Sequence, residues 1–302
     1  MIEFKPVTPR DKELLTSYFF PGERRDANLS IVNLCSWQFL TCSSFAVVDG
    51  LPVLRFCFDS ARTVYTIPGG GVRAEEVVRQ LARQAVEEGL PLYFYGIVPE
   101  LRELLDKVFP EVFEYKENRD HFDYLYLRKD LAELKGKDYQ TKRNHVNKFK
   151  KRYDFRFIPL TAEMVPDCLR LYDEWGGERR CGEDEGLKQE RQALTYALER
   201  FRELDVTGGS LWVEGRMVAF TFGAPVNYDT FCVHAEKALG EFEGAYNAIN
   251  QEFAQYLPEK FVYLNREEDL GLPGLRKAKM SYRPVRLLEK GLAVCPPELL
   301  SL

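Results

Sequence analysis

The sequence lacks the hydrophobic segments of an exported or membrane-spanning protein. Its 302 residues include no run of about 18 consecutive apolar residues, the length that a helix needs to cross a bilayer. The N-terminus contains Glu3 and Lys5 and no apolar signal core. The seven cysteines form no Cys-x-x-Cys pair, and such an odd, irregularly spaced set is typical of buried thiols in a reducing compartment. We therefore expect a cytoplasmic protein whose only contact with a membrane would be peripheral.

Several catalytic and metal-binding patterns are also missing. The three histidines, His121, His145 and His234, are far apart and show no His-x-x-x-His spacing, so no metal site and no tightly bound cofactor is predicted. No Gly-x-Ser-x-Gly sequence is present for a serine nucleophile. The formal net charge of −5 disfavours a general nucleic-acid coat, so a polyanionic partner would have to bind a local basic patch.

What the sequence does contain is one order of predicted elements, used twice. Each copy has two apolar strands joined by a two-residue turn, Asp49-Gly50 in the first and Glu214-Gly215 in the second, which favours a β-hairpin. Another strand, a glycine-containing loop, an amphipathic helix and an aromatic strand follow, the last at 92–95 or 261–264. We expect a further aromatic strand, 122–127, to complete the first copy. The apolar fraction of 45% is enough for two packed cores.

A basic segment separates the two copies. Residues 142–152 hold six Lys or Arg and no acid, and at helical spacing Val146 and Phe149 can pack inward while the cations surround the rest of the helix. The predicted division is an N-terminal domain, a basic linker helix and a C-terminal domain, at 1–135, 136–154 and 155–302. The glycine run 69–71 is interpreted as a plain turn between a strand and a helix.

This element order resembles the GNAT acyltransferase fold, used in tandem as in the Fem-type peptidyl transferases. Five more specific motifs lie from Lys142 onward: Lys142-Arg143-Asn144-His145-Val146-Asn147-Lys148-Phe149, His234-Ala235-Glu236-Lys237-Ala238, Asn265-Arg266-Glu267-Glu268-Asp269-Leu270-Gly271, Gly274-Leu275-Arg276-Lys277-Ala278-Lys279 and Ser281-Tyr282-Arg283-Pro284. In these motifs the second half is more closely similar to the soluble C-terminal domain of phosphatidylglycerol lysyltransferases and its free-standing relatives.

The resemblance implies an α/β (α+β) fold of two tandem GNAT-like domains, each with a mixed, mostly antiparallel sheet flanked by helices. It implies an aminoacyl transferase that moves an amino acid from aminoacyl-tRNA to an amine or hydroxyl acceptor. The multi-pass membrane half of the lysyltransferases has no counterpart in this sequence. The acceptor therefore stays open between a lipid head group, a peptide and a small molecule.

Two groups of side chains are candidates for binding a phosphate-bearing donor. The first is in the linker helix, where a solvated basic face is the alternative interpretation; its members are Lys142, Arg143, Asn144, Asn147 and Lys148. The second is in the final helix, where Arg276, Lys279 and Arg283 recur at i, i+3 and i+7 and are expected to share one side, with Tyr282 next to them. An ordinary exposed face is again the alternative.

The loop from Gly240 to Gly244 opens a helix, and free N–H groups at such a position favour anions. Glu241 and Glu243 disfavour a phosphate there. GNAT proteins that bind coenzyme A typically carry a basic or glutamine residue in this loop, so the acidic loop weakens the acyl-CoA alternative without excluding it.

Carboxylates in two of the motifs are candidates for a general base: Glu236, Glu267, Glu268 and Asp269. Clustered carboxylates near Arg266 can have widely separated pKa values, which places one of them near neutrality. They could instead hold the ammonium group of a cationic substrate, or cap the next helix. His234, Lys237 and Asn265 complete the candidate binding set; for His234 a buried core histidine is favoured over a catalytic one.

Three functions are therefore compared. The first is an aminoacyl transferase using charged tRNA, and the second is a GNAT-type N-acyltransferase using acyl-CoA. The third is a non-catalytic module that binds an anionic ligand between the domains. All three require the basic segment 142–152 and the acidic string 265–269 to share one cavity.

Overall fold

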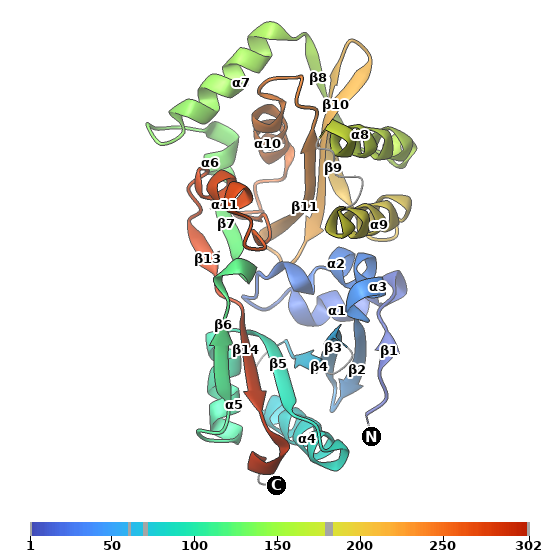
Figure 1. The fold of residues 1–302 in the computed structure, drawn as a ribbon, viewed down its shortest axis with the longest axis vertical. Coiled ribbons are helices and arrows are strands. Elements are labelled where there is room, and N and C mark those ends of the chain that lie inside the picture. The colour runs from blue at the N-terminus through green and yellow to red at the C-terminus, as the bar shows by residue number, and fades with distance from the viewer. Residues whose placement is uncertain (1, 60–61, 69–71, 179–183, 301–302) are drawn as a thin grey trace.

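A computed structural model describes residues 2–59, 62–68, 72–178 and 184–300. These residues form two seven-stranded sheets with their flanking helices, stacked along the long axis of the molecule (Figure 1). We call the sheet that contains the first hairpin, with its helices, the first lobe, and the other sheet with its helices the second lobe. The glycine run 69–71, predicted as a turn, lies outside the described residues.

The first sheet has the order β1-β2-β3-β4-β5-β14-β6. Its strands are β1 (Lys5–Pro6), β2 (Ser44–Val48), β3 (Leu51–Asp59), β4 (Arg62–Thr66), β5 (Leu92–Ile97), β14 (Gly291–Cys295) and β6 (Glu114–Glu117). The predicted Asp49-Gly50 turn joins β2 to β3, and both of its residues have the positive φ that a tight hairpin requires. Strands β4 and β5 are parallel because helix α4 (Val72–Glu88) connects them.

The second sheet repeats this pattern in the order β13-β7-β12-β11-β10-β9-β8. Its strands are β13 (Arg286–Leu288), β7 (Asp123–Leu127), β12 (Tyr263–Asn265), β11 (Thr230–Ala238), β10 (Arg216–Pro225), β9 (Thr207–Val213) and β8 (Phe155–Pro159). The Glu214-Gly215 turn joins β9 to β10, and helix α10 (Ala245–Tyr256) connects the parallel strands β11 and β12. Each sheet is thus mixed and mostly antiparallel, as predicted.

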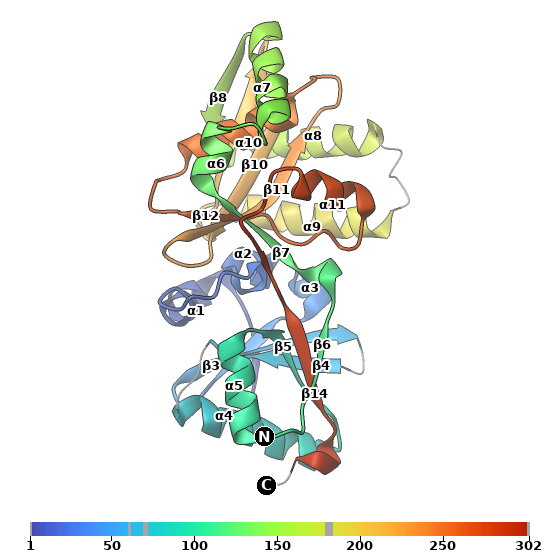
Figure 2. The ribbon, with the colours of Figure 1, turned by 90° about the vertical axis from the view of Figure 1, so that its left-hand side faces the viewer.

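The two lobes exchange strands. Strand β7, expected to complete the first copy, pairs with β12 and β13 in the second sheet, so that expectation is wrong. Strand β14, near the C-terminus, inserts between β5 and β6 of the first sheet. In Figure 2, β7 and the chain that leads from β13 into β14 pass each other where the two lobes meet, a region that we call the waist. The division of the chain into domains at residues 135 and 155 stays a prediction. The two sheets do not follow it, because each sheet contains one strand from the other side of that division.

The remaining helices cover the sheets and fill the space between them. They are α1 (Lys12–Phe19), α2 (Ile31–Ser36), α3 (Gln38–Thr41), α5 (Pro99–Val108), α6 (Arg128–Glu133), α7 (Gln140–Arg152), α8 (Val165–Glu178), α9 (Glu185–Glu199) and α11 (Pro273–Met280), with short 3₁₀ turns at Pro9–Asp11, Ala27–Leu29, Arg119–His121, Ala162–Met164 and Pro297–Leu299. Helices α1 to α3 lie between the sheets (Figure 1). One apolar core joins Leu15 and Phe45 of the first lobe to Leu171 and Phe220 of the second.

Candidate functional site

The predicted acidic string forms a loop at the waist, directly after the short strand β12. We call residues 265–269 the acidic loop. Asn265 fixes its start: its amide donates to the backbone oxygen of Arg25 at 2.7 Å and to Asp123 at 2.9 Å, and its oxygen accepts the Glu267 N–H at 2.7 Å. Lys279 donates to the backbone oxygens of 266, 267 and 268. The loop is therefore held by side chains of the second lobe and by the backbone oxygen of Arg25 from the first.

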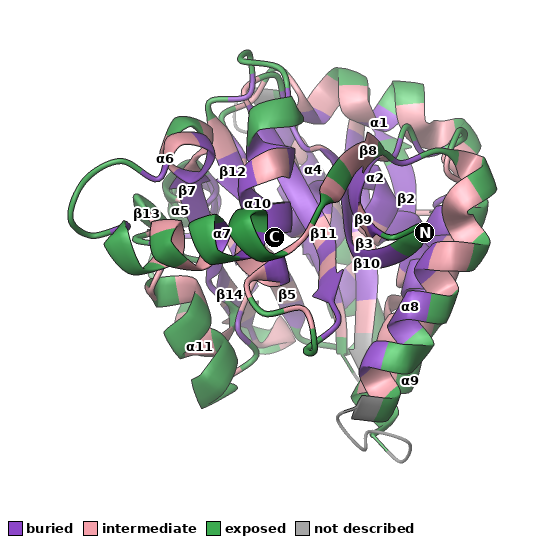
Figure 3. Ribbon diagram, turned by 90° about the horizontal axis from the view of Figure 1, so that it is seen from above, coloured by how far each residue is buried: buried purple, intermediate pink, exposed green. Residues whose placement is uncertain are grey.

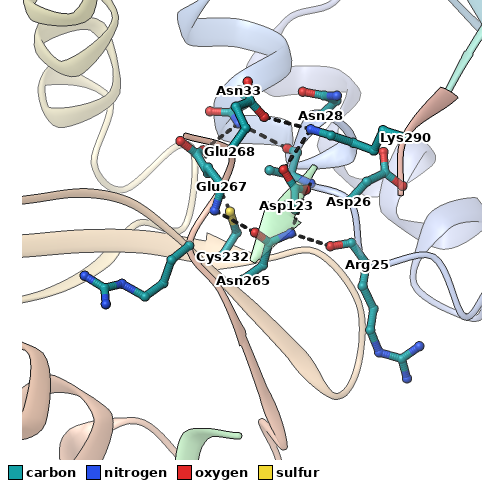
Figure 4. A network of polar contacts seen from close by, with 12 residues as sticks. Arg25, Asp26, Asn28, Asn33, Asp123, Cys232, Asn265, Glu267, Glu268 and Lys290 are labelled. Carbon is teal, nitrogen blue, oxygen red and sulfur yellow. Dashed lines mark hydrogen bonds and ion pairs between the residues drawn. The ribbon is translucent and has the colours of Figure 1, made fainter. Parts of the chain in front are cut away.

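The first charged group of the site is a buried ion cluster (Figure 4). Lys290 Nζ lies 2.7 Å from Asp123 Oδ1 and 2.7 Å from Glu268 Oε2. Burial raises the pKa of Glu268 to about 7, because Asp123 and Glu267 add to the effect and Lys290 offsets only part of it. Burial also acts to raise the pKa of Asp123, but its ion pair with Lys290 holds that pKa below the usual value.

Next to this cluster, three side chains form a hydrogen-bonded chain across the lobes. Ser30 Oγ lies 2.8 Å from His234 Nε2, and His234 Nδ1 lies 2.9 Å from Glu267 Oε1. Asn33 donates to the same Glu267 oxygen at 2.9 Å. Cys232, two residues before His234 on β11, places its sulfur 3.7 Å from Nδ1 and 3.8 Å from Oε1. Among the described residues, this is the one group of donors close enough together for a metal ion.

A second set of cations and aromatics surrounds Arg266. Its guanidinium donates to Glu236 at 2.8 Å and lies 5.1 Å from the centre of the Tyr282 ring. Lys142, at the start of α7, lies 4.2 Å from the centre of the same ring. Burial lowers the pKa of Lys142, and the nearby Arg266 lowers it further. Within the described part of the chain, the buried Nη1 of Arg266 has no hydrogen-bond partner.

Asp269, the last predicted base, is an anchor for α11. Its fully buried carboxylate accepts two hydrogen bonds from Arg276, at 2.8 and 2.7 Å, one from the Gly271 N–H at 2.9 Å and one from the Tyr124 hydroxyl. These donors, Arg276 foremost, hold the pKa of Asp269 well below its usual range. Helix α11 ends at Met280, so Arg283 leaves the helix and the predicted shared face of Arg276, Lys279 and Arg283 does not form.

The basic helix α7 covers the second lobe and does not lie between the lobes (Figure 1). Lys148 pairs with Glu243 at 2.7 Å, and Lys150 pairs with Glu252 at 2.5 Å. Arg143 donates to backbone oxygens of the preceding turn, including Gly136 at 2.9 Å. Three of the six cations of residues 142–152 thus pair with acids of their own lobe, as the solvated-face alternative predicts: Lys148, Lys150 and Arg152. Lys142 contacts the surroundings of Arg266 instead.

The other predicted binding residues lie on α7 or on β11. Asn144 and Asn147 are exposed, and they belong to α7, which presents a largely exposed surface in Figure 3. Lys237 points away from the acidic loop. It pairs with Glu190 of α9 at 2.8 Å, on the face of the second sheet that α8 and α9 cover. His234 and Glu236 share the opposite face, as strand alternation predicts, and both contact the acidic loop.

A cavity of about 370 Å³ lies where α7 and α11 meet. Its lining combines cations with polar and apolar groups: Asp138, Thr141, Lys142, Met280, Ser281 and Arg283. Arg283 lies 3.4 Å from Asp138 at its rim. The first turn of the basic helix and the segment after α11 therefore share a cavity, but none of its lining residues belongs to the acidic loop, so this cavity is not the common one that was expected. The link between the two segments is the ring of Tyr282, which both Lys142 and Arg266 contact.

Sequence reasoning missed the residues that come from the exchanged strands and from α2. Asp123 begins β7 and Lys290 precedes β14, so neither is near the acidic loop in sequence. Ser30 and Asn33 belong to the first lobe, which carries none of the recognised motifs. One usable signal was present: Cys232 and His234, at i and i+2 on a strand, had to share a face.

No helix in the described ranges is both long and apolar enough to span a membrane.

Comparison with known proteins identifies a family and relatives with similar sequences. A model of the family described as phosphatidylglycerol lysyltransferase, C-terminal, matches residues 21–294. An uncharacterized protein of Mycoplasmoides gallisepticum is 25% identical over 177 residues, which are 56% of this chain and 55% of that protein. The match thus spans about half the length of that relative.

Three solved structures share the architecture. A conserved protein of unknown function from Bacteroides thetaiotaomicron is 45% identical with a TM-score of 0.93, covering 98% of this chain and 100% of that one. L-PGS from Bacillus licheniformis is 17% identical with a TM-score of 0.67, over 97% and 93% of the chains. FemX is 9% identical with a TM-score of 0.61, over 96% and 97%. These comparisons confirm the predicted resemblance and the tandem GNAT-like fold.

Proposed function

The chain belongs to the family of phosphatidylglycerol lysyltransferase C-terminal domains, and from this membership we propose that it transfers an amino acid from aminoacyl-tRNA to an amine or hydroxyl acceptor. The acceptor would be carried by a lipid head group, a peptide or a small molecule. The observation that carries the proposal is the buried Nη1 of Arg266, which has no hydrogen-bond partner among the residues that the structure describes. Arg266 is on the same loop as Glu268, and it shares the ring of Tyr282 with Lys142.

A buried guanidinium N–H without a partner is costly, and a ligand oxygen would satisfy it. In the proposed complex, Arg266 and Lys142 hold the phosphate or carbonyl oxygens at the 3′ end of the donor. The cavity between α7 and α11 admits that end. The rest of the tRNA would lie along α7, whose exposed lysines add contacts that weaken with salt.

Glu268 is the base in this proposal. Its pKa of about 7 lets the carboxylate accept a proton near neutral pH, whereas Asp269 is buried among donors and Glu236 is paired with Arg266. The acceptor N or O attacks the ester carbonyl carbon and gives its proton to Glu268. The new amide or ester bond forms as the ester bond to the ribose breaks, and the ribose oxygen leaves with that proton.

The acyl-CoA alternative has less support from the geometry. In a GNAT-type site the donor phosphates would meet the N-terminus of α10, but Gly244 there lies against α7: a Cβ on Gly244 would come within 2.5 Å of the His145 backbone oxygen. Glu243 beside it is paired with Lys148. A flat thermal-shift response to a panel of CoA esters would remove this alternative.

The test measures binding of charged tRNA and transfer to a mixture of amine and hydroxyl acceptors, followed by mass spectrometry. We expect Lys142→Met to weaken binding and to reduce the slope of log K against log salt by about 0.7–0.9, the contribution of one phosphate contact. Glu268→Gln should bind charged tRNA normally and lose about 10²–10⁴-fold in transfer rate.

Lys116→Met is the matched control, because Lys116 is an exposed lysine on β6 at the edge of the first sheet. Failure of the unmodified chain to bind any charged tRNA at low salt would refute the proposal.

A further inference from the structure

Cys232, His234 and Glu267 bring one sulfur, one nitrogen and one oxygen to a common point beside the acidic loop. The three donor atoms are separated by 3.7 Å for sulfur to nitrogen, 3.8 Å for sulfur to oxygen and 2.9 Å for nitrogen to oxygen. A tetrahedral zinc ion binds sulfur at about 2.3 Å and nitrogen or oxygen at about 2.0–2.2 Å, which separates its donor atoms by roughly 3.3–3.6 Å. An ion would therefore need only small side-chain shifts.

The three donors are held by the second sheet and by the loop that follows β12. Cys232 and His234 lie on β11, the central strand beside β10 and β12, and the pairing with β10 shifts its register at His234. The Cys232 sulfur and His234 Nδ1 nevertheless lie on the same side, 3.7 Å apart. Glu267 is in the acidic loop, which Asn265 and Lys279 hold in place. A site whose ligands are placed by a strand and a braced loop pays little conformational entropy when it binds an ion.

Outer contacts also match those of a metal site. With Nδ1 of His234 on the metal, Nε2 keeps its 2.8 Å contact with Ser30, which would fix the ring and its tautomer. Asn33 donates to Glu267 Oε1 at 2.9 Å, which orients that carboxylate. Ligating imidazoles and carboxylates are commonly oriented in this way.

The local charge and exposure favour a cation. Three carboxylates, those of Glu267, Asp123 and Glu268, act on Cys232 against the single ammonium of Lys290. Cys232 is fully buried and the His234 side chain is 5% exposed, but Glu267 keeps 27% exposure, which gives an ion a route of entry. A sulfur, an imidazole and a carboxylate together suit zinc better than magnesium or calcium, which prefer oxygen ligands.

We propose that Cys232, His234 and Glu267 form a three-ligand zinc site at the waist of the molecule. The fourth position is open to water or to an oxygen of a bound ligand, as in zinc sites with three protein ligands. The thiol loses its proton when it binds the ion. The inference does not depend on the proposed transfer reaction, since ion binding is measured without tRNA or acceptor.

The test uses the full chain, stripped of metal with a chelator under reducing conditions and then titrated with Co²⁺ and Zn²⁺. We expect one Co²⁺ per chain, a charge-transfer absorption band from a cobalt–thiolate bond, and loss of that band when Zn²⁺ displaces Co²⁺. Absence of the band in the folded chain, or zinc binding weaker than micromolar, overturns the proposal.

Variants identify the ligands. Cys232→Ser should abolish the cobalt–thiolate band, and Asn33→Ala should weaken zinc binding about 10–100-fold, the usual effect of losing an outer contact. Cys168→Ser, a buried cysteine on α8, is the control and should leave the band unchanged. A band that persists in Cys232→Ser would show that another thiol binds the ion and would overturn this assignment. If Cys232→Ser does not fold, the band and its displacement in the unmodified chain still decide whether a thiolate site exists.

Discussion

At the scale of single residues, Glu268 and Asp269 show how neighbours decide the chemistry of two adjacent carboxylates. Asp269 accepts hydrogen bonds from Arg276, Tyr124 and a backbone N–H, so its ionised form is stabilised and its pKa falls. Glu268 is next to other acids and has one ammonium partner, Lys290, so burial raises its pKa to about 7. The two carboxylates are neighbours in the sequence, and their pKa values move in opposite directions because their partners differ.

The raised pKa of Glu268 predicts a pH dependence of stability. The folded chain holds the Glu268 proton up to about pH 7, whereas the unfolded chain releases it near pH 4.5. The contribution of protonated Glu268 to the free energy of unfolding is therefore fully present below pH 4.5 and is lost as the pH rises from 4.5 to about 7. We expect the free energy of unfolding of the native protein to fall, relative to Glu268→Gln, between these two values.

Urea denaturation of both proteins at a series of pH values checks this expectation. Glu103→Gln, which removes an exposed carboxylate on α5, is the matched control and should show no such divergence from the native protein. Parallel curves for the native protein and Glu268→Gln would show that Glu268 titrates normally.

At the scale of elements, the position of α7 depends on one glycine at the start of α10. Gly244 has φ 90°, and a Cβ there would lie 2.5 Å from the His145 oxygen and 3.1 Å from the Phe149 Cβ. Phe149 is fully buried in the core that α7 and α10 share with the second sheet. The glycine therefore allows close packing of the two helices, which explains a residue that the sequence alone associated with anion binding.

Gly244→Ala is predicted to destabilise the protein in two ways. The left-handed backbone alone costs about 1–2 kcal/mol with a side chain present, and the contact with α7 adds a further cost of about 1–3 kcal/mol. Gly215→Ala is the control, since Gly215 has φ 81° but nothing within 4 Å of its Cβ position. Denaturation of both variants should show the larger loss for Gly244→Ala; equal losses would contradict the packing argument.

At the scale of the whole molecule, the exchanged strands and the shared core tie the lobes into one unit. Strand β14 is interior to the first sheet, between β5 and β6, although it lies near the C-terminus. The core between the sheets takes Leu15 and Phe45 from one lobe and Leu171 and Phe220 from the other. Neither lobe has a complete sheet without the other half of the chain.

A fragment of residues 1–135 is therefore predicted not to fold alone. Without β14, strand β6 has no partner in the first sheet and β5 becomes an exposed edge. Near-ultraviolet circular dichroism of the fragment should show no fixed aromatic packing, and the full chain should unfold in one cooperative transition. Cooperative unfolding of the isolated fragment would show that the first lobe is independent after all.

The sequence by itself determined the local structure. The Asp49-Gly50 and Glu214-Gly215 turns, the apolar strands beside them and the amphipathic helices depend on backbone preference and periodicity, which act over a few residues. The same local patterns, used twice, predicted two mixed sheets, and both are present. Strand alternation also placed His234 and Glu236 on one face.

Only the tertiary structure decided which strands exchange and which charges meet. An aromatic strand such as β7 satisfies the same local pattern in either sheet, so its partner is chosen by long-range pairing and packing. The ion cluster joins Asp123, Glu268 and Lys290 from three distant segments, and the zinc ligand set joins a strand to a loop. Burial and partners, which fix the pKa of a carboxylate or the approach of a metal ligand, depend on that long-range arrangement.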